Sequence, residues 1–204
     1  MGVVGKAIDG TERYNGSVAY SVRERAFMAA YDFEGHITDI PDYPEPGVIF
    51  KDITTLLREP EGFKATIDAI ADHFKDAGIT KVVGAEARGF MIGAPVAYSL
   101  GAGFVPARKP GKLPREVCSE SYELEYGTDS LEIHTDALDE NDVVLIVDDL
   151  VATGGTAVAQ AHLIEQFGAK LAGMGFLMEL DFLNPCEAIA KATDAEVFAL
   201  VHVD

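Results

Sequence analysis

The chain has 204 residues, of which 48% are hydrophobic, and this is typical of one soluble domain with a substantial core. It contains no apolar run of about 18 residues and no secretory signal pattern, so we expect no membrane span and a cytoplasmic protein. The formal net charge of −18 argues against a nucleic-acid partner, because such binding requires cations that neutralise phosphates. An anionic substrate would likewise need a local cluster of cations.

The first twenty residues combine glycines and polar residues with little periodicity. They predict a loose extension ahead of a single domain that spans residues 21–204. Apolar residues at helical spacing predict a first helix over residues 22–33. The two cysteines, Cys118 and Cys186, lack metal-type spacing and are expected to be reduced and incidental.

Residues 40–55 contain three prolines within six positions, which forbid a helix and stiffen a loop. The apolar segment Val48, Ile49 and Phe50 follows. It has two interpretations. It is either a loop that caps the core or a rigid wall for a flat aromatic ligand, on which Phe50 would stack.

Helix and strand patterns alternate over residues 60–106. Pro60 can start a helix whose apolar stripe ends before Gly78, and residues 81–84 form a short buried strand. A loop over residues 85–90 leads into a helix that runs to about Leu100, with Pro95 inside it, and residues 102–106 form the next strand. Arg88 in the loop is either a surface salt-bridge partner or an anion ligand.

A cationic segment follows, with four of the sixteen basic side chains within eight positions: Arg108, Lys109, Lys112 and Arg115. Its prolines and glycine indicate a mobile, exposed loop. Residues 120–127 alternate like a strand, and residues 131–134 provide an antiparallel partner. The segment is therefore either a solvated loop or a hairpin lid that closes over an anion and excludes water.

The most informative stretch is VVLIVDDLVATGGTA, residues 143–157. Its five apolar residues, 143–147, predict a strand buried on both faces. Asp148 and Asp149 follow, then a loop to Gly155, and then a helix over residues 157–167 that Thr156 opens. Glycines and a helix N-terminus bring backbone N–H groups to an anion, while adjacent carboxylates accept hydrogen bonds from sugar hydroxyls. The stretch fits a ribose 5-phosphate, or else an ordinary strand–turn–helix crossover with solvated aspartates.

The last part of the chain predicts a strand over residues 171–180, a helix over residues 184–192 and a strand over residues 197–201. We expect His73, His162 and His202 to be ordinary surface or structural residues. The alternation of strands and helices predicts one α/β domain with a twisted, mostly parallel sheet. Ligands bind beyond the carboxyl ends of such strands, where the polar residues that follow the predicted strands can converge.

Four segments together resemble a known family, the type I phosphoribosyltransferases. The stretch at residues 143–157 resembles their motif for phosphoribosyl pyrophosphate (PRPP), and residues 85–90 resemble their pyrophosphate loop. The strings PGVIFKDIT, RKPGKLP and YELEYG resemble the base-binding hood and the lid of the adenine-specific members. The resemblance implies a parallel sheet flanked by helices, with a small N-terminal hood and a hairpin lid.

The resemblance further implies transfer of the 5-phosphoribosyl group from PRPP to adenine, which gives AMP and pyrophosphate. Transfer to another purine, hypoxanthine or guanine, and a PRPP-sensing regulator of the same fold remain alternatives. The family is typically homodimeric, and it uses Mg²⁺ that is carried by the substrate's phosphates rather than by a protein metal site. A cis peptide bond is expected between Glu86 and Ala87.

The resemblance also assigns site residues. Glu125 is the expected catalytic acid/base. The expected PRPP ribose-5-phosphate residues are Asp148, Asp149, Ala152, Thr153, Gly154, Gly155 and Thr156. The expected pyrophosphate-binding residues are Arg88, Arg108, Lys109, Lys112 and Tyr126. The expected adenine-binding residues are Ile49, Phe50 and Lys51, where Lys51 replaces the arginine of many members.

Overall fold

The computed structural model describes residues 31–124 and 127–204. The predicted N-terminal extension, most of the predicted helix over residues 22–33, and Glu125 and Tyr126 lie outside the described residues. Residues 31–33, the end of that predicted helix, are not helical.

The centre of the fold is a five-stranded sheet in the order β4 (Gly103–Ala107), β3 (Lys81–Ala85), β7 (Val143–Val151), β8 (Lys170–Leu180) and β9 (Glu196–Val203). All neighbouring pairs are parallel, which confirms the predicted class. The apolar run of β7 lies in the middle of the sheet, and its residues 144–147 are completely buried. A strand covered on both faces needs apolar side chains in both directions, as this sequence provides.

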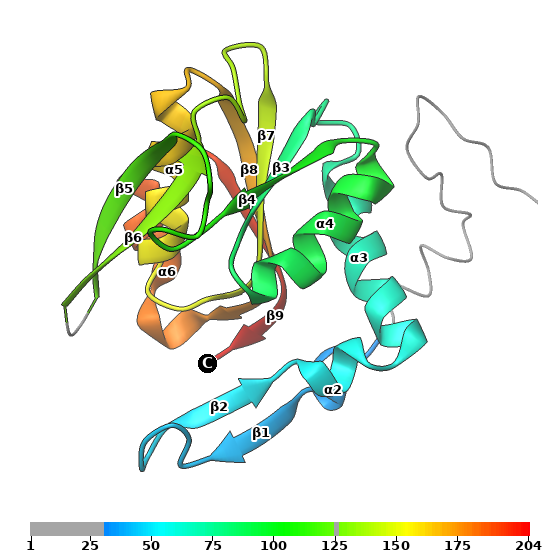
Figure 1. Ribbon diagram of the computed structural model, residues 1–204. Coiled ribbons are helices and arrows are strands. Elements are labelled where there is room, and N and C mark those ends of the chain that lie inside the picture. The colour runs from blue at the N-terminus through cyan, green and yellow to red at the C-terminus, as the bar shows by residue number, and fades with distance from the viewer. Residues whose placement is uncertain (1–30, 125–126) are drawn as a thin grey trace, which may run out of the picture.

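Helices cover both faces of the sheet (Figure 1). On one face, α3 (Pro60–Phe74) and α4 (Arg88–Leu100) pack on Leu145 and Val147. On the other face, α5 (Gly155–Gln166) and α6 (Pro185–Ala190) pack on Val144 and Ile146. Successive side chains of β7 thus point to opposite layers, and the sheet separates two hydrophobic clusters.

The start and end signals of the helices agree with the structure. Pro60 occupies the first turn of α3, and Gly78, after its end, adopts a left-handed φ of 71°. Pro95 lies inside α4, and Gly101 ends that helix with φ 70°. Left-handed backbone of this kind favours glycine because it carries no Cβ.

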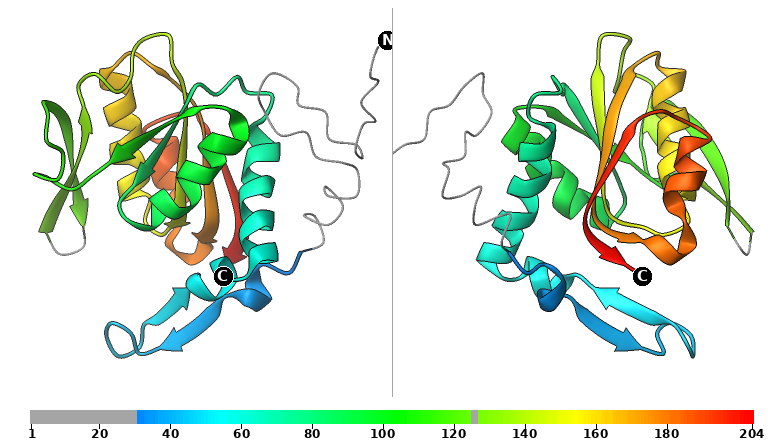
Figure 2. Two further views of the ribbon diagram at one scale, coloured as in Figure 1. Left: turned by 45° about the vertical axis from the view of Figure 1, so that its right-hand side comes forward. Right: turned by 180° about the vertical axis from the view of Figure 1, so that it is seen from behind.

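The proline-rich segment forms a small hood. A short 3-10 turn (Glu34–His36) leads into two strands, β1 (Thr38–Pro41) and β2 (Ile49–Asp52), which pair antiparallel. The short helix α2 (Thr54–Leu57) follows β2. The hood hairpin projects away from the sheet in both views of Figure 2. The sequence of residues 40–55 predicted only a loop. Strands form because the prolines lie at the end of β1 and in the turn, where no ladder hydrogen bond is lost.

The predicted lid hairpin consists of β5 (Val117–Leu124) and β6 (Gly127–His134), which pair antiparallel along their full length. It stands beside α5, where the Glu120 carboxylate lies 3.1 Å from Nδ1 of His162. Cys118 and Tyr122 pack against the core.

Among the described residues, no helix is both long and apolar enough to span a bilayer.

The predicted end of the central strand was wrong. The strand predicted to end at Val147 continues as β7 to Val151, through both aspartates. The reason is its neighbour, because β8 is long enough to pair with Asp148, Leu150 and Val151. The acid pair is therefore fixed in a strand rather than in a loop.

Candidate active site

The loop between β7 and α5 forms the first part of the site. Gly154 precedes α5 with φ 84°, and a Cβ there would lie 3.0 Å from the carbonyl oxygen of Pro185. Only glycine fits this position without strain. The backbone N–H of Val158 bonds back to Gly154, so the N–H groups of the first helical turn remain available to an anion. A cavity of about 100 Å³ lies at this loop, lined by residues 150–157 with Asp148, Gln160 and Phe176.

The acid pair lies at the mouth of this loop. Asp149 is 5% exposed, and its backbone N–H donates to Oδ1 of Asp148 at 2.8 Å. Burial, and then the negative charge of Asp149, raise the pKa of Asp148 well above its ordinary value. Hydroxyl donors that bind Asp148 would favour its charged form, so the pair suits a sugar diol.

The backbone approaches this pair closely at Gly89, in the first turn of α4. A Cβ on Gly89 would lie 2.8 Å from Oδ1 of Asp148 and 3.3 Å from the carbonyl oxygen of Val147. The absence of a side chain at Gly89 therefore allows the pyrophosphate-type loop to reach the acid pair.

Arg88 connects the acid pair to the hood. Its Nε lies 3.0 Å from Oδ2 of Asp149, and its guanidinium carbon lies 5.5 Å from the centre of the Phe50 ring. The contact with Asp149 is an ion pair rather than an aligned hydrogen bond, because Oδ2 has no hydrogen-bond partner among the described residues. That oxygen can still accept a hydroxyl. The peptide bond between Glu86 and Ala87 is cis, as the resemblance implied.

The three expected adenine-binding residues have different surroundings. Phe50 contacts Arg88 and also the Tyr43 ring, with centroids 5.3 Å apart. Ile49 is 59% exposed. The Lys51 Nζ lies 2.8 Å from Asp39 of β1, in a separate cavity of about 190 Å³ beside the end of β9. The structure brings Phe50 to Arg88, which pairs with Asp149, whereas the side chain of Lys51 pairs with Asp39.

The cationic segment is held by carboxylates. Nη2 of Arg108 lies 2.7 Å from Oε2 of Glu86, and the backbone N–H of Lys109 donates to the other oxygen of Glu86 at 2.6 Å. Nζ of Lys109 lies 2.9 Å from Asp129 on β6. The Arg108 hydrogen bond lowers the pKa of Glu86, and the Asp129 hydrogen bond raises the pKa of Lys109.

Arg115 pairs with Asp136, so Lys112 alone of the four cations has no ion pair with a described residue. The predicted exposed loop is thus attached to the pyrophosphate-type loop through Glu86. An anion that binds the Lys109 ammonium would compete with Asp129 for it.

Gln160 was not among the site residues expected from the sequence. This residue of α5 is completely buried, and neither its Oε1 nor its Nε2 has a hydrogen-bond partner in the described chain. It lines the cavity at the phosphate-type loop, one helical turn after Thr156. The spacing of four residues from Thr156 was the available signal, because such residues share a helix face.

Comparisons with known proteins agree with this geometry. Residues 52–198 match the family described as phosphoribosyl transferase domain. The chain is 55% identical over 170 residues to the adenine phosphoribosyltransferase of Aeromonas salmonicida, a match that covers 83% of this chain and 93% of that protein. The chain belongs to the adenine phosphoribosyltransferase family.

Solved structures of the family have the same fold. The adenine phosphoribosyltransferase of Thermoanaerobacter pseudethanolicus matches with a TM-score of 0.80 at 46% identity, over 84% of this chain and 98% of that chain. The Saccharomyces cerevisiae enzyme, crystallised with adenine and an imino-altritol bisphosphate, matches with a TM-score of 0.78 at 39% identity, over 86% and 99%. The type I phosphoribosyltransferase fold is thereby confirmed.

Proposed function

We propose that this protein transfers the 5-phosphoribosyl group of PRPP to adenine, with AMP and pyrophosphate as products. The observation that supports this most is the position of Arg88. Its guanidinium contacts both Asp149 of the sugar-type site and the Phe50 ring of the hood. A sugar, an anion and a flat ring would therefore meet around one side chain, as base transfer to a ribosyl carbon requires.

In this proposal the loop after β7 binds the 5-phosphate through backbone N–H groups of residues 152–156 and the hydroxyls of Thr153 and Thr156. Gln160 donates its unpartnered amide N–H to the same phosphate. Asp148 and Asp149 accept hydrogen bonds from the ribose hydroxyls. Positive charge builds on the sugar as pyrophosphate leaves, and the two carboxylates stabilise it.

The leaving pyrophosphate binds Arg88, Arg108, Lys109, Lys112 and Tyr126. Arg88, Arg108 and Lys109 are each paired with a protein carboxylate, so a phosphate oxygen that binds them competes with that carboxylate. Phosphate carries more charge than one carboxylate, so the exchange is favourable when PRPP binds. Mg²⁺ would be held by the phosphate oxygens of PRPP rather than by a protein metal site, and when bound it would neutralise charge on the pyrophosphate. Asp148 and Asp149 remain the partners of the ribose hydroxyls.

Adenine stacks on Phe50 of the hood, near Ile49 and Lys51, and Glu125 transfers the proton at the base. Arg88 now lies over the Phe50 ring. A cation–π contact at an exposed site contributes about 0.5–1 kcal/mol, whereas a hydrogen bond to a charged group contributes about 1.5–3 kcal/mol. Arg88 therefore moves toward pyrophosphate when PRPP binds and leaves the ring to adenine.

We also propose a domain organisation, in which residues 21–204 form one phosphoribosyltransferase domain preceded by a loose extension. We further propose that the protein is a cytoplasmic homodimer and has no nucleic-acid partner. Sedimentation equilibrium of the full chain measures the oligomeric state. A monomer at micromolar concentration would contradict the dimer.

The test of function is AMP formation by the purified full chain with PRPP, Mg²⁺ and radiolabelled adenine, in competition with hypoxanthine and guanine. We expect adenine to be used and the other purines to compete poorly. Phe50→Ala should raise the KM for adenine, whereas Tyr98→Ala, which removes a ring that is 78% exposed on α4, should not. Preference for hypoxanthine or guanine, or PRPP binding without pyrophosphate release, would contradict the proposal in favour of the other purine or of a regulator.

A further inference from the structure

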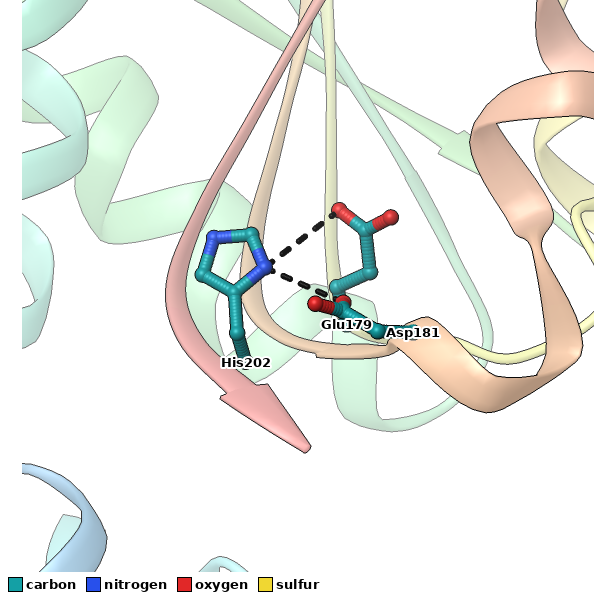
Figure 3. Close-up of side chains that lie close together, drawn as sticks. All are labelled: Glu179, Asp181 and His202. Atoms are coloured by element: carbon teal, nitrogen blue, oxygen red, sulfur yellow. Dashed lines mark hydrogen bonds and ion pairs between the residues drawn. The ribbon is translucent and has the colours of Figure 1, made fainter. Parts of the chain in front are cut away.

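A second cluster of polar side chains lies at the carboxyl ends of β8 and β9. Glu179 on β8, Asp181 in the 3-10 turn η2 (Asp181–Leu183) and His202 on β9 point toward one another (Figure 3). One ligand atom of each lies within 4.8 Å of the other two. Nδ1 of His202 is 3.1 Å from Oδ1 of Asp181 and 4.0 Å from Oε2 of Glu179.

The fold builds this cluster from neighbouring strands. Glu179 pairs with His202 in the parallel ladder between β8 and β9, and η2 turns the chain so that Asp181 returns to the same place. Glu179 is 7% exposed, whereas His202 is open to solvent. The second oxygen of Glu179, Oε1, lies 3.0 Å from Sγ of Cys186 in α6. A buried carboxylate is thus surrounded by an imidazole, a second carboxylate and a thiol.

We propose that Glu179, Asp181 and His202 bind one divalent transition-metal ion of the Zn²⁺ class, with Cys186 as the nearest further donor. Tetrahedral Zn²⁺ with bonds of about 2.0–2.1 Å places its ligand atoms roughly 3.3 Å apart. The separations of 3.1 Å (His202 to Asp181) and 4.0 Å (His202 to Glu179) lie on either side of this value, and all three ligand atoms lie within 4.8 Å of one another. Side-chain rotations would bring the three atoms to bonding distance of one ion.

The donor types favour a transition metal over Mg²⁺. Imidazole nitrogen and thiolate sulfur are ligands of Zn²⁺, whereas Mg²⁺ requires oxygen ligands in octahedral geometry. The charge balance also favours a cation. Within the described chain, His202 is the only ion-pair partner of Glu179 and of Asp181. This site is therefore distinct from the Mg²⁺ that the substrate carries.

The location indicates what the ion does. On its other side Glu179 pairs with Val151, the last residue of β7 before the phosphate-type loop. A metal here links β8, β9 and η2 directly behind that loop, and Cys186 adds α6. The ion is a structural cross-link outside the catalytic machinery, so the inference does not depend on the proposed function.

The test uses tag-free full-length protein that has been stripped of metal with a chelator. Titration with Zn²⁺ alone, in competition with a chromophoric chelator, should give one ion per chain with a micromolar or lower Kd. Zn²⁺ at a hundredfold excess over Kd should raise the melting temperature by roughly 5–10 °C. A tenfold excess of Mg²⁺ should not displace the ion.

His202→Asn, at an exposed position, should weaken Zn²⁺ binding at least tenfold. His134→Asn is the control, because the side chain of this half-buried histidine has one hydrogen bond with a described residue, to the Glu116 carbonyl, and lies outside the cluster. With Co²⁺ as probe, a thiolate charge-transfer band that Cys186→Ser abolishes and Cys118→Ser retains would establish the fourth ligand. Absence of stoichiometric Zn²⁺ uptake, or uptake that His202→Asn leaves unchanged, would overturn the proposal.

Discussion

The Gln160 amide is expected to lower the stability of the protein without ligand but to increase its affinity for PRPP. Its side chain is completely buried and both polar atoms lack partners in the described chain. A buried unsatisfied donor or acceptor costs about 1–3 kcal/mol. Gln160→Met retains the length of the side chain without a strong hydrogen-bonding group, so it should raise the free energy of unfolding by about 2 kcal/mol. For a chain of this size the melting temperature should rise by about 4–8 °C.

The same substitution should weaken substrate binding. If the amide donates to the 5-phosphate, its loss removes a hydrogen bond to a charged group, which contributes about 1.5–3 kcal/mol. The Kd for PRPP should then increase by about 10- to 150-fold. Thermal melts without ligand and calorimetric titrations with PRPP and Mg²⁺ measure the two effects.

Gln166→Met is the matched control on the same helix, because Gln166 is exposed and donates only to Glu120. It should change both quantities little. A Gln160→Met protein that melts at a lower temperature than the parent, with unchanged PRPP affinity, would refute both parts of the reasoning.

Three further predictions concern charged groups and a thiol. The pKa of Asp148 is raised on folding, so ionisation of this carboxyl destabilises the folded state only as pH rises above the unfolded pKa of about 4. Asp148→Asn should therefore stabilise the ligand-free protein more at pH 8 than at pH 4. Equal shifts in melting temperature at the two pH values would contradict this. Lys109→Met should raise the Kd for PRPP and pyrophosphate at least tenfold but change the Kd for adenine less than about twofold. The control is Lys191→Met, because Lys191 is an exposed lysine that pairs with Glu187. Equal losses of affinity for all three ligands would mean that Lys109 has a structural role. Partial desolvation, and then the contact with Glu179, raise the pKa of the Cys186 thiol to about 11, although the residue is exposed. Iodoacetamide at pH 8 should therefore alkylate Cys186 roughly a hundredfold more slowly in the metal-free folded protein than in urea. Similar rates, measured by peptide mass spectrometry, would contradict the raised pKa.

The sequence predicted those parts of the site that one continuous segment builds. The apolar run, the acid pair and the glycines between residues 143 and 156 determine a buried strand, a turn and a helix start, and the structure forms all three. Pro60 correctly marked the start of one helix, and Gly78, with its left-handed backbone, lies a few residues beyond the end of that helix at Phe74. Such features depend on backbone geometry, which neighbouring residues determine.

Features that depend on distant residues were not predicted. Asp148 and Asp149 lie in a strand because β8 extends beside them, and the length of β8 is not encoded in β7. Lys109 pairs with Asp129 across the lid. The cluster around His202 brings together side chains that are up to 23 positions apart in the chain, through parallel pairing of β8 with β9. Sequence spacing gives no sign that His202 and Cys186 lie in one cluster, because pairing of distant strands brings them together.

The central claim is that the loop after β7 and the acid pair bind a phosphorylated ribose. Calorimetric titration of the full chain with PRPP in the presence of Mg²⁺ tests it most directly. We predict one site per chain with micromolar affinity, weakened at least tenfold by Asp149→Asn. No detectable binding at millimolar PRPP, or identical binding by Asp149→Asn, would contradict the account.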